Sequence, residues 1–412
     1  MYHGLRDSQN ARVLYLDMNS FFASVEQQRN PNLRNKPLAV VSHIGPAGTI
    51  LAASYEAKAF GLKTGMRMKE ALPLCPQVLQ VEVSSRPYRE VHRKFMAILQ
   101  ELCGPEVRAC SVDEAVIPLS RNWYGSEKAH QLAHAIKARF REELGECIKC
   151  SIGIAPNTFL GKLGTDLKKP DGLVEITLEN TPEILSKITL TDLCGIAERN
   201  AIRLGKHGIT TPLEFYSADP EFLRRTFGIW GQYWWWKLHG LEPDVGTGPL
   251  KSMSHEHALK KWAHSRAEIE PVMDRLADRL IHRLRHNNFQ CRRVGVFFRC
   301  KGFGGRWFDA DLTAGNQTYE TLLSTIHRLV KELPEVPPGP IKKVGIYFGK
   351  LSPTGNGFQL GLFDDGKSER VSSAIEFVRA RYGFNAIQRG TVVALPENIA
   401  KEKLGFGRVK DL

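Results

Sequence analysis

The sequence has 412 residues, of which 42% are hydrophobic and 25% charged, as in soluble globular proteins of several domains. The formal net charge is +13, a basic excess typical of proteins that bind nucleic acid or another polyanion, although solubility alone would account for part of it. No apolar run approaches the roughly 20 residues of a membrane span, and the N-terminus has no apolar signal region. These features exclude a membrane-spanning protein and favour a cytosolic one.

The first predicted element is a short apolar strand over residues 13–16 that ends at an acid, Asp17. Asn19 and Ser20 are typical of the cap of a following helix, which carries Phe22. A carboxylate at the end of a buried strand is costly unless it meets a cation. Taken alone, Asp17 is explained more simply as a turn residue.

Residues 50–66 predict a strand that leads into a helix and closes in glycine-rich turns. Tyr55 and Lys58 are three residues apart, so they share one helix face. A hydroxyl and a cation side by side are suited to hold a phosphate. An ordinary amphipathic helix is the equally simple alternative.

Residues 107–119 predict a strand in which two adjacent acids, Asp113 and Glu114, have apolar neighbours. Because neighbouring residues of a strand face opposite sides, one acid is expected on the same surface as Asp17 and the other near a bend or edge. Three carboxylates on neighbouring strands suit Mg²⁺, which prefers carboxylate oxygens and substrate phosphates. Two such ions carry out nucleotidyl transfer.

An amphipathic helix is predicted over residues 126–144, a strand over 150–154 and a second helix starting at Asn157. Lys162 and Lys169 are one heptad apart, so we expect them to face the same way and to contact a triphosphate. A solvated charged face is the alternative. Cys147 and Cys150 form a C-x-x-C without a second ligand pair, which favours buried thiols over a zinc site.

Residues 187–245 contain two helical units with a Gly-Ile before each turn, at 195–196 and 208–209, a pattern similar to a helix-hairpin-helix. Such a turn holds a backbone phosphate without reading sequence. We interpret the three tryptophans at 234–236 mainly as helix packing.

Residues 251–350 form a separate basic block with 18 Lys+Arg against 10 Asp+Glu, an excess of 18 − 10 = 8. The predicted order is strand, helix, strand, strand, helix, strand, over 251–259, 265–287, 291–301, 306–313, 318–333 and 341–348. Alternating cations and apolar residues at 291–301 predict a half-buried sheet whose basic face lies against phosphates.

The tail from about residue 351 is rich in Ser, Pro, Gly and Asn. Apolar anchors within it predict a peptide that docks in a partner's groove. The residues of this peptide that would contact the partner are Gln359, Leu360, Leu362 and Phe363. A short helix is predicted over 374–383.

Together these motifs resemble those of the Y-family translesion DNA polymerases, and within them the bacterial polymerase IV group. The resemblance covers about residues 12–350 and rests on four motifs and on KSMSHEH at 251–257, which resembles the entry to the family's little finger. The four motifs are YLDMNSFFASVE at 15–26, ASYEAK at 53–58, CSVDEA at 110–115 and GKLGTDLKKPDG at 161–172.

The resemblance implies an α+β multidomain fold shaped as a right hand, with a ferredoxin-like palm, small fingers, a helical thumb and an α/β little finger. The expected ranges are palm 1–28 and 80–178, fingers 29–79, thumb 179–249, little finger 250–350, and a tail over 351–412. The tail from 364 onward is longer than is typical of polymerase IV and is closer in style to the SOS mutagenesis polymerases.

The resemblance also implies roles for residues at the matching positions. Asp17, Asp113 and Glu114 would be catalytic and, with the Met18 carbonyl, would bind two Mg²⁺ ions. Phe22 matches the steric gate against ribonucleotides. The incoming triphosphate would be contacted by Tyr55, Lys58 and Lys169, with Lys58 standing where the family usually has Arg. Residues 359–363 resemble the peptide that holds the sliding clamp.

The function implied is error-prone DNA synthesis during DNA damage tolerance and the SOS response, with primer-template DNA, deoxynucleoside triphosphates and the sliding clamp as partners. We expect a monomer in the cytoplasm, associated with the nucleoid. The alternative is a non-catalytic DNA- and clamp-binding accessory relative. A nucleotide cyclase with a similar palm is less consistent with the helix-hairpin-helix and the basic block.

Overall fold

The computed structural model describes residues 12–119, 126–243, 250–355 and 366–395. The chain divides into two compact units, residues 1–245 with 403–412 and residues 246–402. Each unit has hydrophobic cores of its own. Within the described ranges, no helix is both long and apolar enough to cross a membrane.

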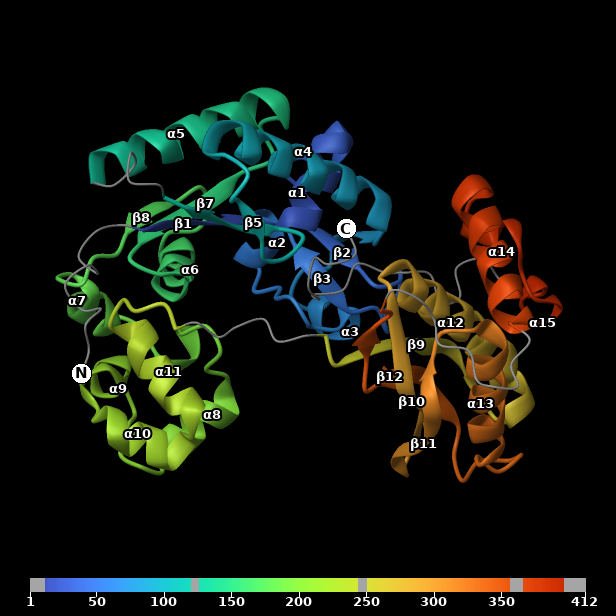
Figure 1. Cartoon of the computed structure of the whole chain (residues 1–412). Coiled ribbons are helices and arrows are strands. Elements are labelled where there is room, and N and C mark those ends of the chain that lie inside the picture. Colours follow the sequence, from blue (N-terminus) through green and yellow to red (C-terminus); the bar gives the residue numbers. More distant parts are fainter. Residues whose placement is uncertain (1–11, 120–125, 244–249, 356–365, 396–412) are drawn as a thin grey trace. The chain divides into compact units, whose positions relative to one another are not determined.

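A five-stranded sheet forms the centre of the first unit (Figure 1). Its order is β5-β6-β1-β7-β8, and all neighbours are antiparallel except β7 and β8. Strand β1 lies in the middle with all six residues buried, as its apolar run predicts. The strands are β1 (Val13–Met18), β5 (Arg108–Ala109), β6 (Glu114–Pro118), β7 (Cys150–Ala155) and β8 (Leu173–Glu175).

Helices lie on both faces of this sheet (Figure 1). The helices α4 and α5 cover one face, and their apolar residues join those of α1 and the sheet in one core. On the other face α6 approaches β7 so closely that a Cβ atom at Gly153 would lie 2.0 Å from the carbonyl oxygen of Gly161. The helices are α1 (Phe21–Arg29), α4 (Ser85–Cys103), α5 (Ser126–Glu143) and α6 (Thr158–Leu167).

A smaller sheet of order β3-β2-β4 lies between α1 and α4 in the sequence. Strand β2 pairs antiparallel with β3 and parallel with β4. Two short helices complete its separate core. The elements are η2 (Pro31–Leu33), β2 (Leu38–Val41), β3 (Ile50–Ala53), α2 (Tyr55–Ala59), α3 (Met68–Ala71) and β4 (Leu79–Glu82).

The remainder of the first unit is helical and packs around a third core. The predicted helix-hairpin-helix is confirmed, because α8 and α9 are joined through Gly208, whose φ of +79° favours glycine. Trp234 and Trp235 pack against this core, as predicted. The helices are α7 (Thr181–Leu185), η4 (Leu190–Asp192), α8 (Glu198–Gly205), α9 (Pro212–Ser217), α10 (Pro220–Phe227) and α11 (Ile229–Leu238).

The second unit is an antiparallel sheet of order β11-β10-β12-β9 with two helices packed on one face. The predicted order of strands and helices in this block is confirmed. Along β10, Val294, Val296, Phe298 and Cys300 are buried, whereas Arg299 is exposed, so the sheet is half-buried as predicted. The elements are β9 (Ser252–Ala263), α12 (Arg266–His286), β10 (Phe289–Cys300), β11 (Gly304–Asn316), α13 (Tyr319–Lys331) and β12 (Ile341–Gly349).

The outward face of this sheet is less uniformly basic than its sequence suggests. Arg293 binds Asp311 through Nε at 2.8 Å, and the Lys350 ammonium lies 2.9 Å from the same carboxyl group. Glu256 on β9 forms an ion pair with Lys343 on β12. Acids on neighbouring strands therefore neutralise one cation of the predicted stretch, Arg293, and two further cations, Lys343 and Lys350.

A C-terminal helical extension packs on α12 and α13 of the same unit. The helix predicted over 374–383 is present but begins earlier. It is α14 (Lys367–Tyr382), which starts directly after Gly366. The extension is anchored by buried ion pairs that sequence periodicity does not show. Its other elements are β13 (Ser352–Pro353), which pairs with β10, η5 (Phe384–Ala386) and α15 (Gly390–Val393).

Candidate active site

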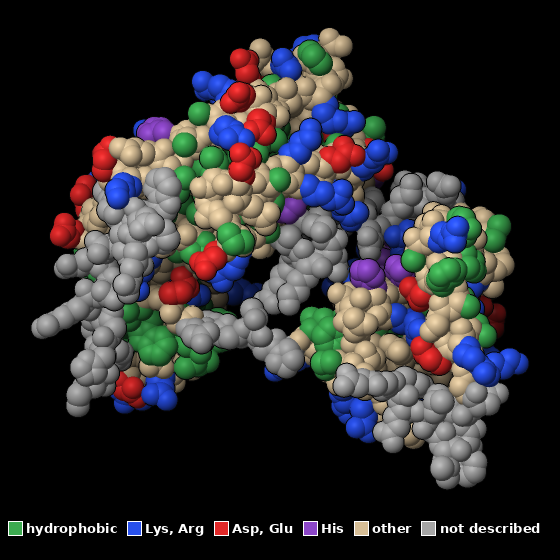
Figure 2. Space-filling model, turned by 45° about the horizontal axis from the view of Figure 1, so that its top comes forward, with side chains coloured by type: hydrophobic (Ala, Val, Ile, Leu, Met, Phe, Trp, Pro, Cys, Tyr) green, Lys and Arg blue, Asp and Glu red, His purple; other side chains and the backbone are tan. Residues whose placement is uncertain are grey.

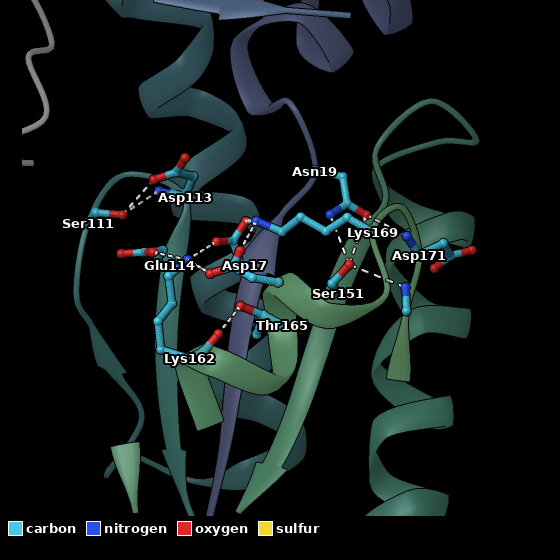
Figure 3. Close-up of polar contacts among 12 residues, drawn as sticks. Asp17, Asn19, Ser111, Asp113, Glu114, Ser151, Lys162, Thr165, Lys169 and Asp171 are labelled. Carbon is cyan, nitrogen blue, oxygen red and sulfur yellow. Dashed lines mark hydrogen bonds and ion pairs between the residues drawn. The ribbon is translucent and has the colours of Figure 1, made fainter. Parts of the chain in front are cut away.

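The pairing of β1 with β6 places Asp17 directly opposite Glu114 (Figure 3). Asp113 lies one residue before β6, and its carbonyl oxygen accepts a hydrogen bond of 2.8 Å from the Met18 N–H. Asp17 is 6% exposed. The predicted meeting of these acids at neighbouring strands is therefore present in the fold.

The prediction of one continuous strand over residues 107–119 is wrong. The chain forms a tight hairpin there, in which the N–H groups of Cys110 and Ser111 donate to the carbonyl oxygen of Glu114. The Ser111 hydroxyl also donates to Asp113 Oδ1 at 2.5 Å. Such local side-chain bonds compete with a strand ladder, so Asp113 lies in the turn and only Glu114 in the strand.

Two lysines contact these carboxylates (Figure 3). Lys162 Nζ is hydrogen-bonded to Asp17 and lies 2.8 Å from Glu114 Oε1. Lys169 Nζ lies 3.0 Å from Asp17 Oδ1 and 2.7 Å from Asp166 Oδ1. The predicted convergence of the two lysines is present, but not for the predicted reason. Helix α6 ends at Leu167, and the following turn directs Lys169 back to the site.

The electrostatics reflect this crowding of charge. Burial, together with the negative charges of Asp17 and Glu114, raises the pKa of Asp113 to about 6, although the Ser111 hydroxyl partly opposes the shift. Burial favours the neutral form of Lys162, but the neighbouring carboxylates outweigh it and raise the pKa of this lysine. The neighbouring carboxylates therefore favour the charged form of Lys162.

The turn that carries Lys169 is held by residues far apart in the sequence (Figure 3). Asn19 Oδ1 accepts a 2.7 Å bond from the Asp171 N–H, and Asn19 Nδ2 donates to Ser151 Oγ at 3.0 Å. The same serine oxygen accepts from the Gly172 N–H at 3.2 Å. Of the two residues predicted to cap α1, Ser20 occupies the N-cap position, without a side-chain cap bond, whereas Asn19 lies before it.

Tyr55 and Lys58 share one face of α2, as predicted, and Lys58 Nζ lies 4.6 Å from the centre of the Tyr55 ring. Burial and the positive charge of Lys169 lower the pKa of Lys58. Burial raises the pKa of Tyr55 to about 12, with a contribution from Asp17. The charges of Asp17 and Lys169 thus act on this pair, which lies within electrostatic reach of the carboxylate cluster.

Phe22 lies on α1, is 7% exposed and stacks on Tyr88 of α4 with ring centres 4.2 Å apart. The Tyr88 hydroxyl donates to Glu26 Oε1 at 2.9 Å, and this bond fixes the Tyr88 ring on which Phe22 stacks. Sequence reasoning missed Tyr88, Asn19 and Ser151 as supporting residues. Their partners lie 62 to 152 positions away, so no local pattern indicates them.

The donor set fits a hard divalent cation, because carboxylate and carbonyl oxygens are the ligands that such ions prefer. In the described ranges no three acidic, Cys or His side chains are arranged as a metal site, and the lysine ammonium groups lie against the acids. The prediction of buried thiols is confirmed for Cys150, whereas Cys147 is only partly buried. The predicted clamp peptide at 359–363 lies outside the described residues.

Comparisons with known proteins show the family of this chain. The family described as impB/mucB/samB matches residues 16–166, and its C-terminal domain matches 250–362. DNA polymerase IV of Bacteroides fragilis (strain YCH46) is 31% identical over 337 residues, which cover 81% of this chain and 91% of that protein. DNA polymerase IV of Bacillus velezensis is 29% identical over 398 residues, 94% of each chain.

Among solved structures, a Y-family DNA polymerase chimera of Dbh and Dpo4 matches with a TM-score of 0.68 at 23% identity, covering 82% of this chain and 98% of that chain. The fold is therefore that of a Y-family DNA polymerase, with palm, fingers, thumb and little finger, as predicted. Within that class the chain belongs to the impB/mucB/samB family, and its curated relatives are DNA polymerases IV. This family depends on divalent metal ions.

Proposed function

We propose that the protein is a template-directed DNA polymerase of the translesion type, which adds deoxynucleotides to a primer 3′ end during DNA damage tolerance. The observation that carries this proposal is the placement of Asp17 opposite Glu114 on paired strands, with Asp113 in the adjoining turn. Family membership supports it. Two lysines on the same carboxylates supply the positive charge that a triphosphate requires.

In this proposal Asp17, Asp113 and Glu114, with the Met18 carbonyl, would hold two Mg²⁺ ions. When bound, such ions would supply positive charge that lowers the pKa of the primer hydroxyl and favours departure of pyrophosphate. The lysines at 162 and 169 compensate the acids and bind phosphate oxygens. We include Lys162 in the proposed site because its Nζ atom contacts Asp17 and Glu114.

Phe22 would lie against the sugar of the incoming nucleotide and exclude a 2′-hydroxyl by its bulk. Its stack on Tyr88 supports this role, because the ring is held in place by a partner that is itself hydrogen-bonded. Tyr55 and Lys58 would contact the triphosphate from α2. Lys58 supplies one charge without the bidentate fork of Arg, so its contact is a point interaction.

The domain ranges follow from the same proposal. The five-stranded sheet with 1–28 and 80–178 would be the palm, 29–79 the fingers, 179–249 the thumb and 250–350 the little finger, followed by the tail at 351–412. The helix-hairpin-helix and the outer face of β10 would contact the backbone of primer-template DNA. Residues 359–363 would hold the sliding clamp, with the protein acting as a nucleoid-associated monomer.

Primer extension by the Asp113→Ala variant tests the proposal. We expect Mg²⁺-dependent extension to fall by at least about a thousandfold while DNA affinity stays within about twofold, because the substitution removes a site carboxylate and leaves the backbone of the hairpin. Glu142→Ala, an exposed acid on α5, is the matched control and should extend normally. Robust extension by Asp113→Ala would refute the proposal.

The same assay separates the alternatives. An accessory relative would bind primer-template DNA but would not extend it even as the unaltered protein. A nucleotide cyclase would consume triphosphate without primer or template.

A further inference from the structure

A hollow of about 470 Å³ lies between α5, the segment before β7 and the turn that carries Lys169. Phe140, Ile148 and Cys150 line its floor and are almost fully buried, with exposures of 1 to 3%. The hollow therefore has an apolar floor, and charged side chains surround it. Its volume lies within the range of about 300 to 1,000 Å³ that is usual for small-molecule sites.

Cations line this cavity in excess of acids. Arg141 comes from α5, Lys149 from the segment before β7 and Lys168 from the turn, and no carboxylate of the described residues forms an ion pair with them. By contrast Arg139, two residues from Arg141 on the same helix, is bound to Glu101 and Glu143. The cavity thus holds three cations without an ion-pair partner among the described residues, beside two acids of its lining, Glu146 and Asp171.

The concave shape of the cavity strengthens the electric field of these cations. Figure 2 shows acidic and basic side chains mixed over the surface in view, so uniform basicity does not explain the cluster. Like charges around a hollow with low-dielectric walls produce a stronger local field than the same charges on a convex surface. An anion with several charged groups, spaced to reach cations on three different elements, would gain most from it.

We propose that this cavity is a second anion site that binds a phosphate chain, either inorganic pyrophosphate or the phosphates of a free nucleotide. It is distinct from the carboxylate cluster. The terminal phosphates would meet Arg141 and Lys149, and Lys168 would close the site from the turn. If the ligand is a nucleotide, its base would lie against the apolar floor.

The site is connected to the carboxylate cluster through one turn. Lys137, which also lines the cavity, donates from Nζ to the Asp171 carbonyl oxygen at 2.6 Å and to Asp171 Oδ1 at 2.8 Å. The Asp171 N–H in turn donates to Asn19, two residues from Asp17 (Figure 3). An anion in the cavity competes with Asp171 for Lys137 and so acts on the turn that positions Lys169.

Calorimetric titration of the full chain with sodium pyrophosphate, in buffer with EDTA, tests the proposal without relying on polymerase activity. We expect the unaltered protein to bind pyrophosphate at the cavity, and the double variant Arg141→Ala/Lys149→Ala to lose that binding by at least tenfold in affinity. The matched control is Arg93→Ala/Lys94→Ala, two exposed cations on α4, which should bind as the unaltered protein does.

A charge-preserving variant, Arg141→Lys/Lys149→Arg, should retain binding, which separates lost charge from lost fold. Unchanged pyrophosphate affinity and stoichiometry in Arg141→Ala/Lys149→Ala would overturn the proposal.

Titration with a deoxynucleoside triphosphate identifies which ligand supplies the phosphate chain. Equal affinities at the cavity assign the inorganic chain, and tighter triphosphate binding assigns a nucleotide. Either of these supports a phosphate-chain site, whereas failure of both ligands to distinguish the variants contradicts it.

Discussion

Asn19 shows how much a single buried amide contributes to the site. It follows two residues after Asp17, is 1% exposed, and bonds to both Ser151 and Asp171. A buried amide with satisfied donors and acceptors fixes its neighbours in one arrangement. Here it sets the position of the turn and therefore of Lys169 relative to Asp17.

We predict that Asn19→Ala raises the KM for deoxynucleotides about tenfold while kcat falls by less than about threefold. The reason is that the turn loses its anchor to β1, which weakens triphosphate binding more than the carboxylate cluster itself. Steady-state single-nucleotide insertion measures both constants. Gln131→Ala, which removes an exposed side-chain bond to Glu127 on α5, should leave both unchanged. A loss confined to kcat would argue against a positioning role.

For Phe22, we predict that substitution by Ala raises incorporation of ribonucleotides relative to deoxynucleotides by at least about a hundredfold. Removal of the ring opens the space that a 2′-hydroxyl would occupy. Competitive insertion of the two nucleotide types measures the ratio. Phe21→Ala deletes the adjacent ring, which is buried in the core, and should lower stability by about 3–5 kcal/mol without changing the ratio. An unaltered ratio in Phe22→Ala would remove this residue as the gate.

At the scale of elements, the C-terminal extension depends on polar contacts with α12 and α13. His327 of α13 lies 2.5 Å from Asp274 of α12, and the Thr391 hydroxyl of α15 donates to the same carboxyl group at 2.6 Å. Arg389 donates to Asp278 at 3.0 Å. The bond to Asp274 raises the pKa of His327, and the His327 and Thr391 bonds outweigh burial and lower the pKa of Asp274.

These shifts predict a pH dependence. A histidine whose folded pKa is raised contributes stability that is fully present below its unfolded pKa of about 6.5 and is lost as the pH rises through the folded value. The destabilisation caused by His327→Ala should therefore be larger at pH 6 than at pH 9. Thermal unfolding at both values measures it. Thr391→Val removes a non-titrating partner and should cost the same at both pH values; an equal cost for His327→Ala would contradict the assignment.

The comparison of sequence with structure is informative at this scale. The strand carrying Asp17 and the helix carrying Tyr55 and Lys58 could be predicted, because apolar periodicity and three-residue spacing are local properties. The hairpin at Asp113 could not be predicted, since its apolar neighbours indicate a strand, whereas the hydrogen bonds of Ser111 favour a turn. The support of Lys169 by Asn19 and its bond to Ser151, and the anchoring of α14, depend on contacts across more than fifty positions, which no local pattern contains.

For the whole molecule, the net charge of +13 predicts salt-dependent DNA binding, but only unpaired cations contribute to it. Arg299 on the outer face of β10 is exposed and has no ion-pair partner among the described residues, unlike Arg293. The exposed ring of Trp307 lies on the paired strand beside Phe297. This face combines a free cation with aromatic surface.

We predict that Arg299→Ala lowers the slope of log affinity against log salt by about one, as for the loss of one phosphate contact. Fluorescence anisotropy with labelled primer-template DNA over a series of salt concentrations measures the slope. Arg328→Ala removes an exposed cation from α13, on the helical side of the unit, and should leave the slope unchanged. Equal slopes for the two variants would place the DNA contact elsewhere.

The anchored extension also determines where this polymerase can be divided. Asp274 and Asp278 on α12 are about 5% exposed, and their partners include Thr391 and Arg389. A chain ended at residue 350 would leave these two carboxylates with fewer partners in an apolar setting, and loss of a buried partner typically costs about 3–5 kcal/mol. We therefore expect a fragment of the second unit to be stable only if it keeps α14 and α15.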